Sequence, residues 1–202
     1  MVPFLQIVGG TVIAALRLMK EGTLMRQHTS ATKGMALPQP VQDALNEQIT
    51  QEFFASHLYL AMAAYCDRLS LPGFVHWFRL QADEERQHGL KIYDFILNRN
   101  GDVQLGVVNQ PPADFPSVLG VCQQALSHEQ QVSQLIHRLY DQAAQAHDYT
   151  TETFLEWFLM EQVEEEKTAT ELVDWLTMIG DRRDALVLLD REMTQRQPAP
   201  SP

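Results

Sequence analysis

Residues 82–96, ADEERQHGLKIYDFI, lie within a long segment whose apolar residues return every three to four positions. An α-helix turns by about 100° per residue, so residues with this spacing share one face. That face comprises Phe74, Phe78, Ile92 and Ile96. Glu85 and His88 point in nearly the same direction, within about 40° of Phe74. The segment is therefore predicted to form a helix whose core-facing side carries a carboxylate and an imidazole.

Long helical patterns with recognisable ends cover most of the chain. The predicted helices run over Pro40–Arg68, from Pro72 to Asn98–Gly101, from Pro116 to Ala146, from Thr150 or Thr151 to Gly180, and over Asp184–Gln195. Proline suits the first turn of a helix, threonine caps an N-terminus, and glycine ends a helix. We therefore expect four long helices and a short fifth one.

The lengths of the connections indicate the topology. The first two helices are joined by a short link, and so are the third and fourth, which makes each pair antiparallel neighbours. Residues 100–115, NGDVQLGVVNQPPADF, separate the second helix from the third. A connection of this length is uncommon inside a compact domain unless it spans the domain. The pattern predicts an all-α fold, a four-helix bundle with one long crossover and a short C-terminal helix.

Every long helix carries a carboxylate on its apolar face. In the first helix, Glu52 lies among Leu45, Ile49, Leu60 and Ala63. Glu129 has this position in the third helix, and Glu161 and Glu165 have it in the fourth. One such glutamate alone is best explained as a residue at the edge of the face with its head in water. Four helices with the same feature favour a shared cation, because a lone buried carboxylate costs several kcal/mol. Oxygen ligands with one imidazole favour iron or manganese over structural zinc.

Residues beside these faces extend the candidate site. Glu84 and Glu164 lie about 80° from the apolar faces of their helices, where they and Glu161 suit a second cation. Glu166 is expected to be in solvent. Tyr59 has two open interpretations: core packing with its hydroxyl bonded to a buried carboxylate, or electron donation near the metals. Trp157 is equally ambiguous. The remaining histidines are predicted at the surface or its edge: His28, His57, His76, His128, His137 and His147.

Four segments together resemble a bacterial non-haem ferritin, over about Leu37–Gln195. They are LNEQITQEFFASHLYLAMAAYC, ADEERQHGLKIYDFI, HEQQVSQLI and FLEWFLMEQVEEEKTATELVD. The resemblance implies a first iron held by Glu52, Glu85 and His88, with Glu85 bridging. It implies a second iron held by Glu129 and Glu165, with Gln162 as a ligand or hydrogen-bond partner.

The resemblance also implies features around the di-iron site. Tyr59 matches the tyrosine beside it, and Trp157 matches the aromatic residue near a third iron. That third iron would be held by Glu84, Glu161, Glu164 and Glu165. Gln162 and Glu165 stand where bacterioferritins carry Glu and His, so no haem is expected. The fifth helix, ALVLLDREM, favours a homo-oligomeric cage of 24 subunits over the mini-ferritins that bind DNA.

Composition restricts the partners and the domain organisation. The chain has 202 residues with 15 Lys and Arg against 26 Asp and Glu, a net charge of −11, which excludes a basic nucleic-acid surface. Its two cysteines form no CxxC zinc motif. Residues 1–35 are instead basic on balance and are predicted to be an N-terminal extension. Residues 36–196 form the predicted di-iron domain, and residues 197–202 a disordered tail.

The extension has three open interpretations. It is an accessory segment or a mis-assigned start, a disordered or surface-lying extension, or a membrane or targeting element. Its first 16 residues are uncharged, but basic residues follow that apolar stretch rather than precede it, unlike a secretory signal. A membrane association is therefore disfavoured, and a cytoplasmic protein is expected. If the extension is real, the resemblance places it on the cage exterior.

The resemblance implies iron storage and detoxification. Fe(II) would be oxidised to Fe(III) at an intra-subunit ferroxidase site by dioxygen or hydrogen peroxide, and the mineral would be kept in the cage. Two alternatives stay open. One is another di-iron carboxylate oxidase or peroxidase, although no Cys-rich rubredoxin-like segment is present. The other is a metal-buffering bundle without redox turnover.

Overall fold

The computed structural model describes residues 36–198. The predicted N-terminal extension, residues 1–35, and residues 199–202 of the predicted tail lie outside them. Five helices form the described part, and it contains no strand: α2 (Gln39–Arg68), α3 (Pro72–Asn98), α4 (Val118–Gln145), α5 (Tyr149–Ile179) and α6 (Arg183–Met193). The predicted all-α class is confirmed.

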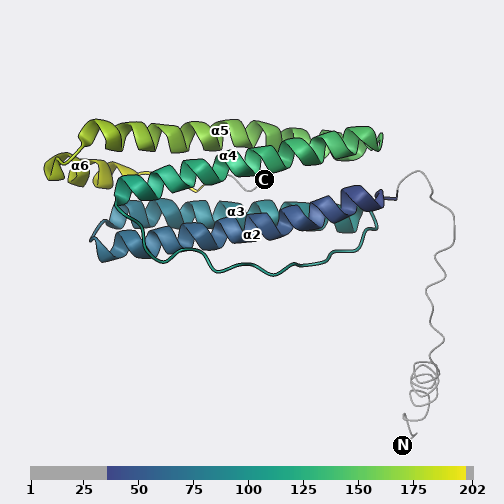
Figure 1. The fold of residues 1–202 in the computed structure, drawn as a ribbon, viewed down its shortest axis with the longest axis horizontal. Helices are drawn as coiled ribbons and strands as arrows, with labels where there is room; N and C mark the ends of the chain where they lie inside the picture. Colours follow the sequence, from purple (N-terminus) through teal and green to yellow (C-terminus); the bar gives the residue numbers. More distant parts are fainter. Residues whose placement is uncertain (1–35, 199–202) are drawn as a thin grey trace, which may run out of the picture. The chain divides into compact units, whose positions relative to one another are not determined.

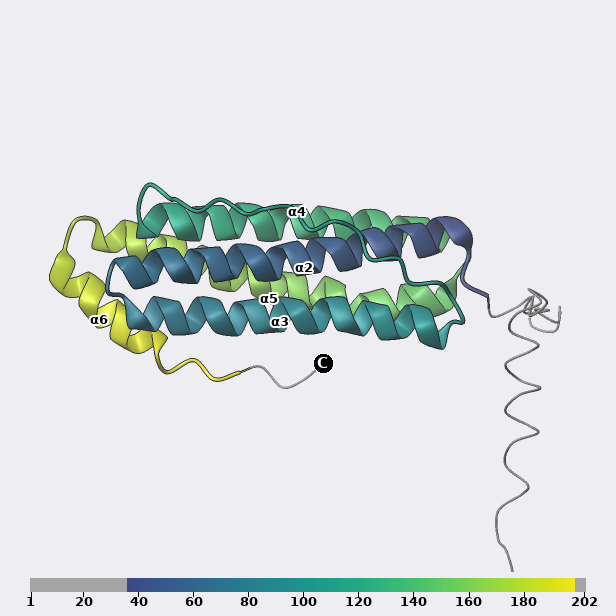
Figure 2. The ribbon, with the colours of Figure 1, turned by 90° about the horizontal axis from the view of Figure 1, so that it is seen from below.

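Four long helices lie side by side in two layers, α2 with α3 and α4 with α5 (Figure 1). The segment between α3 and α4 runs the length of the bundle along α2 (Figure 2). Two buried polar side chains of α2 hold it there. The Gln42 Oε1 atom accepts from the amide of Asp102 at 2.9 Å, and the Asn46 Oδ1 atom accepts from the amide of Gln104 at 2.8 Å. The predicted long crossover is therefore present.

Helix ends differ from the prediction where a side chain caps the backbone. Helix α4 begins at Val118 rather than Pro116, because the Ser117 hydroxyl accepts a hydrogen bond from the amide of Gly120 at 3.0 Å. In α5 the cap is Asp148, whose carboxylate accepts from the amide of Thr151 at 3.3 Å, so the predicted threonine cap is wrong. Gly180 ends α5 with a positive φ of 58°, as expected.

Helix α6 docks on the N-terminal end of α3. The buried Asp190 carboxylate accepts a hydrogen bond from the amide of Phe74 at 3.0 Å. Gly73 allows this close approach, because a Cβ atom there would lie only 1.6 Å from the Asp190 carbonyl oxygen. The short fifth helix is thus fixed to the bundle by a helix-end hydrogen bond and a backbone contact.

Two apolar clusters fill the bundle, and a polar layer lies between them on each of the four long helices. On α2, for example, Ile49 belongs to one cluster, Leu58 belongs to the other, and Glu52 lies between. One predicted core residue is misplaced: Leu60 is 48% exposed in the single chain, since it sits at the edge of its helix face. No helix in residues 36–198 is both long and apolar enough to cross a membrane.

Candidate metal centre

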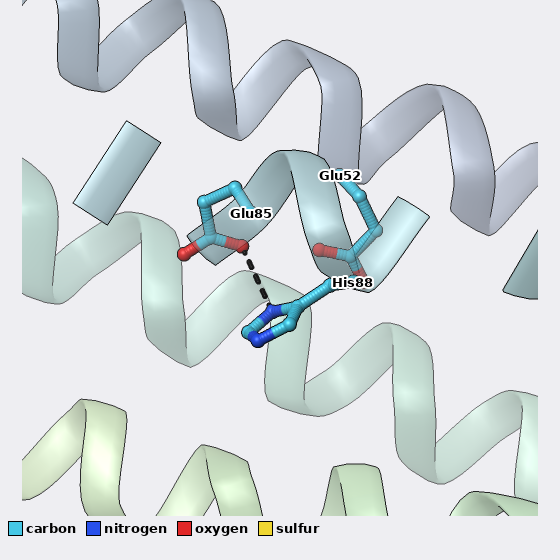
Figure 3. A group of neighbouring side chains, drawn as sticks. All are labelled: Glu52, Glu85 and His88. Atoms are coloured by element: carbon cyan, nitrogen blue, oxygen red, sulfur yellow. Dashed lines mark ion pairs between the residues drawn. The ribbon is translucent and has the colours of Figure 1, made fainter. Parts of the chain in front are cut away.

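Glu52 on α2 meets Glu85 and His88 on α3 inside the polar layer. The three side chains are buried, and one ligand atom from each lies within 4.8 Å of the others. The His88 Nδ1 atom is 3.3 Å from the Glu85 Oε2 atom. Figure 3 shows the two carboxylates and the ring facing one another. Within residues 36–198, no other group of three or more such side chains is this closely spaced.

Glu129 on α4 and Glu165 on α5 line the same layer from the other side of the bundle. Both are at least nine-tenths buried. The Gln162 Nε2 atom donates to the Glu129 Oε2 atom at 3.3 Å, and the Tyr59 hydroxyl donates to the other oxygen of Glu129. Neither of these two glutamates belongs to the group whose ligand atoms lie within 4.8 Å of one another.

Gln81 connects the two halves of the centre, although no pattern in the sequence indicated it. Its Nε2 atom donates to Glu165 Oε2 at 2.6 Å and to Glu85 Oε1 at 3.2 Å. Gln48 has a similar role, with its Nε2 atom 2.8 Å from Glu52 Oε1. Each glutamine precedes a site glutamate by four residues on the same helix, which is the spacing that could have revealed it.

The electrostatics of these side chains favour protonated carboxylic acids. Burial raises the pKa of Glu52 from 4.5 to about 8, and the nearby charge of Glu85 adds to the effect. The pKa of Glu129 rises to about 8 for the same two reasons. Burial, followed by Glu85 and Glu129, raises the pKa of Glu165 well above its usual range. Glu52 and Glu129 therefore retain protons near neutral pH, and Glu165 ionises less readily than an ordinary glutamate.

Glu85 and His88 form the ionised pair of the centre. Burial opposes the charge on each, but their hydrogen bond and mutual attraction outweigh it. The pKa of Glu85 is consequently lowered, and that of His88 is raised to about 10. Among the described residues, the buried Glu52 Oε2 atom has no hydrogen-bond partner. A cation bound here would supply that partner and replace the protons.

The residues expected at a third iron are spread more widely. Glu84 is paired with Arg196 from the segment after α6. Glu161 is half-buried, and Glu164 is exposed and lies 3.8 Å from the Lys167 ammonium. Only Glu165 of this set is buried in the polar layer.

Two predicted surface positions are wrong, while Trp157 adjoins the centre. His128 is buried, and burial lowers its pKa. Glu166 is half-buried and accepts a hydrogen bond from Ser133, which also accepts from Gln162 at 3.3 Å. The half-buried Trp157 has its ring 5.3 Å from that of His88 and 4.2 Å from the Lys91 ammonium. The described histidines other than His88 and His128 are exposed or half-buried: His57, His76, His137 and His147.

Known proteins are similar to this chain in both sequence and fold. A family model for the Ferritin-like domain matches residues 42–179. The bacterial non-heme ferritin of Staphylococcus aureus strain USA300 is 46% identical over 154 residues, which are 76% of this chain and 93% of that protein. The corresponding protein of Staphylococcus epidermidis is 46% identical over 153 residues, 76% of this chain and 92% of its own length.

Solved structures of ferritins are also similar to this chain in fold. An Archaeoglobus fulgidus ferritin engineered into a closed form superposes with a TM-score of 0.80 at 40% identity, covering 81% of this chain and 100% of its own. A humanized archaeal ferritin superposes with a TM-score of 0.81 at 38% identity and covers 82% of this chain and 100% of its own.

Proposed function

This chain belongs to the ferritin family, and from this premise we propose that it stores iron by oxidising Fe(II) at the buried carboxylate centre. The observation that carries the proposal is the convergence of glutamates from four helices in one polar layer, which is expensive to keep without a cation. Iron is the substrate and the stored product of this reaction.

The proposed roles follow the two sides of the layer. Glu52, Glu85 and His88 hold the first Fe(II), and Glu129 and Glu165 hold the second. Glu85 bridges the two ions, since the Gln81 amide places it beside Glu165. Gln162 orients Glu129 or binds the second ion directly. A third Fe(II) binds near Glu84, Glu161, Glu164 and Glu165.

The chain's own groups prepare the reaction by exchanging protons for iron. Glu52 and Glu129 release their protons as Fe(II) enters, because only the carboxylate form binds the cation. Hard oxygen ligands stabilise Fe(III) more than Fe(II), which favours loss of one electron per ion to dioxygen or hydrogen peroxide. Carboxylates also exchange readily, so Fe(III) can leave the site. Tyr59, whose hydroxyl is hydrogen-bonded to Glu129, has two candidate roles: it packs and positions this carboxyl group, or it donates an electron to the reaction.

We further propose a homo-oligomeric cage of 24 copies in the cytoplasm, without haem and without nucleic acid. The acidic chain, with a net charge of −11, attracts cations toward this cage. The di-iron domain comprises residues 36–196, with residues 1–35 as an accessory extension and residues 197–202 as a tail.

Iron loading of the purified protein tests this proposal. Aerobic addition of Fe(II) in large excess over the subunits should give Fe(III) that co-elutes with an assembly of several hundred kDa in gel filtration. A small oligomer that keeps only a few ions per chain would instead indicate a metal buffer or another di-iron enzyme.

A further inference from the structure

The segment after α6 returns along α3 and places Arg196 against it (Figure 2). The guanidinium forms an ion pair with Glu84, and its carbon lies 4.5 Å from the centre of the Trp77 ring. Its Nη1 atom is 3.4 Å from the Trp77 carbonyl oxygen. The His76 Nε2 atom donates to the Arg196 carbonyl oxygen at 3.0 Å. Side chain and backbone of Arg196 are therefore both held on α3.

This contact is largely withdrawn from solvent. The side chains of Arg196 and Glu84 are only 20% and 15% exposed. Screening by water is weak at such a site, so an ion pair or a repulsion acts more strongly than on an open surface. The charge on Arg196 thus has a direct effect on any second cation that approaches Glu84.

Glu84 precedes Glu85 in the chain and belongs to the proposed third iron site. A divalent ion at Glu84 would lie next to the guanidinium and be repelled by it. We propose that Arg196 is a built-in competitor for Glu84, which must leave this carboxylate before a cation binds there. The C-terminal segment then sets the affinity of the third site, an inference that rests on the proposed function.

A purely structural role for Arg196 makes a different prediction. Helix α6 is already attached to α3 by Asp190 and Gly73, before the chain reaches Arg196. A structural arginine would affect thermal stability and leave metal affinity unchanged. An arginine that competes for Glu84 would change the affinity of the third ion and leave the affinities of the first two ions unchanged.

Anaerobic Fe(II) calorimetry on the full chain separates these roles. Arg196→Gln should tighten binding of the third Fe(II) per subunit by roughly 3- to 10-fold, the range for one partly buried charge. Arg196→Lys keeps the charge but loses the planar fork, so its affinity should lie between those of Arg196→Gln and the parent. Arg191→Gln is the matched control, because it removes the same charge from an exposed position on α6.

A second readout follows the arginine itself. The chain has three tryptophans, and subtracting the signal of a Trp77→Phe variant isolates the contribution of Trp77 while leaving Trp157, beside the proposed site, in place. Trp77 is 5% exposed beneath Arg196. Binding of Zn²⁺, which does not change oxidation state, should increase acrylamide quenching of Trp77. With Arg196→Gln, quenching should be high before the metal is added.

The outcomes are distinct. Third-ion binding that is tighter in Arg196→Gln than in both the parent and Arg191→Gln, with metal-dependent exposure of Trp77, is the expected result. Equal third-ion affinity in Arg196→Gln and the parent, with weaker binding in Glu161→Gln, would overturn the competition and leave the third site standing. If no variant binds a third ion, both the third site and its competitor are wrong, while fast oxidation at the first two sites remains a separate measurement.

Discussion

The Tyr59 hydroxyl donates a hydrogen bond to the Glu129 carboxyl group and so joins α2 to α4 across the polar layer. Tyr59 is 1% exposed, and burial, followed by the charges of Glu129 and Glu85, raises its pKa well above the usual value. The proton of Tyr59 therefore stays on the phenol oxygen. The hydroxyl acts as a hydrogen-bond donor and fixes one oxygen of Glu129.

Replacing Tyr59 with phenylalanine should preserve Fe(II) binding and alter the course of the reaction after oxidation. The ring still packs against Trp77 and Phe78, while the hydroxyl that contacts Glu129, a proposed ligand of the second iron, is lost. Optical transients recorded after mixing with oxygen should differ between the two proteins in decay rate or amplitude. Identical transients would show that Tyr59 only packs and positions.

Removing Glu129 should abolish fast oxidation and leave assembly intact. Glu129→Ala deletes a proposed ligand of the second iron, and it also removes a buried carboxyl group whose desolvation is unfavourable. Rapid-mixing kinetics and gel filtration measure the two effects. Glu156→Ala, at an exposed position on α5, is the control and should oxidise iron at the parent rate. A rapid phase that survives in Glu129→Ala would exclude Glu129 from the site.

Gln81→Leu should weaken Fe(II) binding or slow oxidation by about 10- to 100-fold, the usual effect of losing a residue that orients metal ligands. The change removes the amide that holds both Glu85 and Glu165 while keeping a side chain of similar size. Gln87→Leu provides the comparison, because Gln87 is exposed on the same helix. Equal Fe(II) affinities and rates in the two variants would mean that Gln81 does not position the ligands.

The metal-free protein should lose stability as the pH rises from 4.5 toward about 8. In the folded state the pKa values of Glu52 and Glu129 are raised from 4.5 to about 8, whereas in the unfolded chain both groups ionise near 4.5. The folded state then holds more protons across this window, so increasing pH favours unfolding. Fe(II) affinity should change in the opposite direction and increase with pH, because binding releases those protons.

Thermal unfolding at several pH values, with and without a bound divalent metal, checks this linkage. The Glu52→Gln, Glu129→Gln double variant should flatten the pH dependence of the metal-free protein, since neither amide titrates. A slope that is unchanged in the double variant would assign the effect to other groups.

Deleting residues 1–34 should leave the cage and its oxidation rate unchanged. The family match spans residues 42–179, and all the proposed ligands lie within that span. Gel filtration and rapid mixing of the shortened chain measure both properties. Loss of assembly would instead make the extension part of the cage.

Much of the bundle could be predicted from periodicity, because long apolar stripes and a long crossover permit few topologies. The carboxylates were recognisable for an energetic reason: an acid on an apolar face, such as Glu52, is anomalous unless a cation compensates it. Gln81 carried no energetic signal of this kind: only its position four residues before Glu85 distinguished it, and a neutral amide on a helix is unremarkable until its partners are known. The burial of His128 also escaped prediction, because residues just off the stripe are covered by neighbouring helices.

Arg196 shows a second limit. Its contact with Glu84 joins residues 112 positions apart, and it depends on how the chain leaves α6. Periodicity describes one helix at a time and contains no information about such a return. Likewise, local backbone geometry determines that Ser117 and Asp148, rather than neighbouring residues, cap the N-termini of α4 and α5.

The central claim is that the polar layer is a ferroxidase site for two Fe(II) ions. Stopped-flow absorbance in the near ultraviolet tests it most directly, after protein loaded anaerobically with increasing Fe(II) is mixed with oxygen. We expect a fast phase whose amplitude saturates near two Fe(II) per subunit and which disappears in Glu129→Ala. Oxidation no faster than in buffer, with no saturation at that ratio, would contradict it.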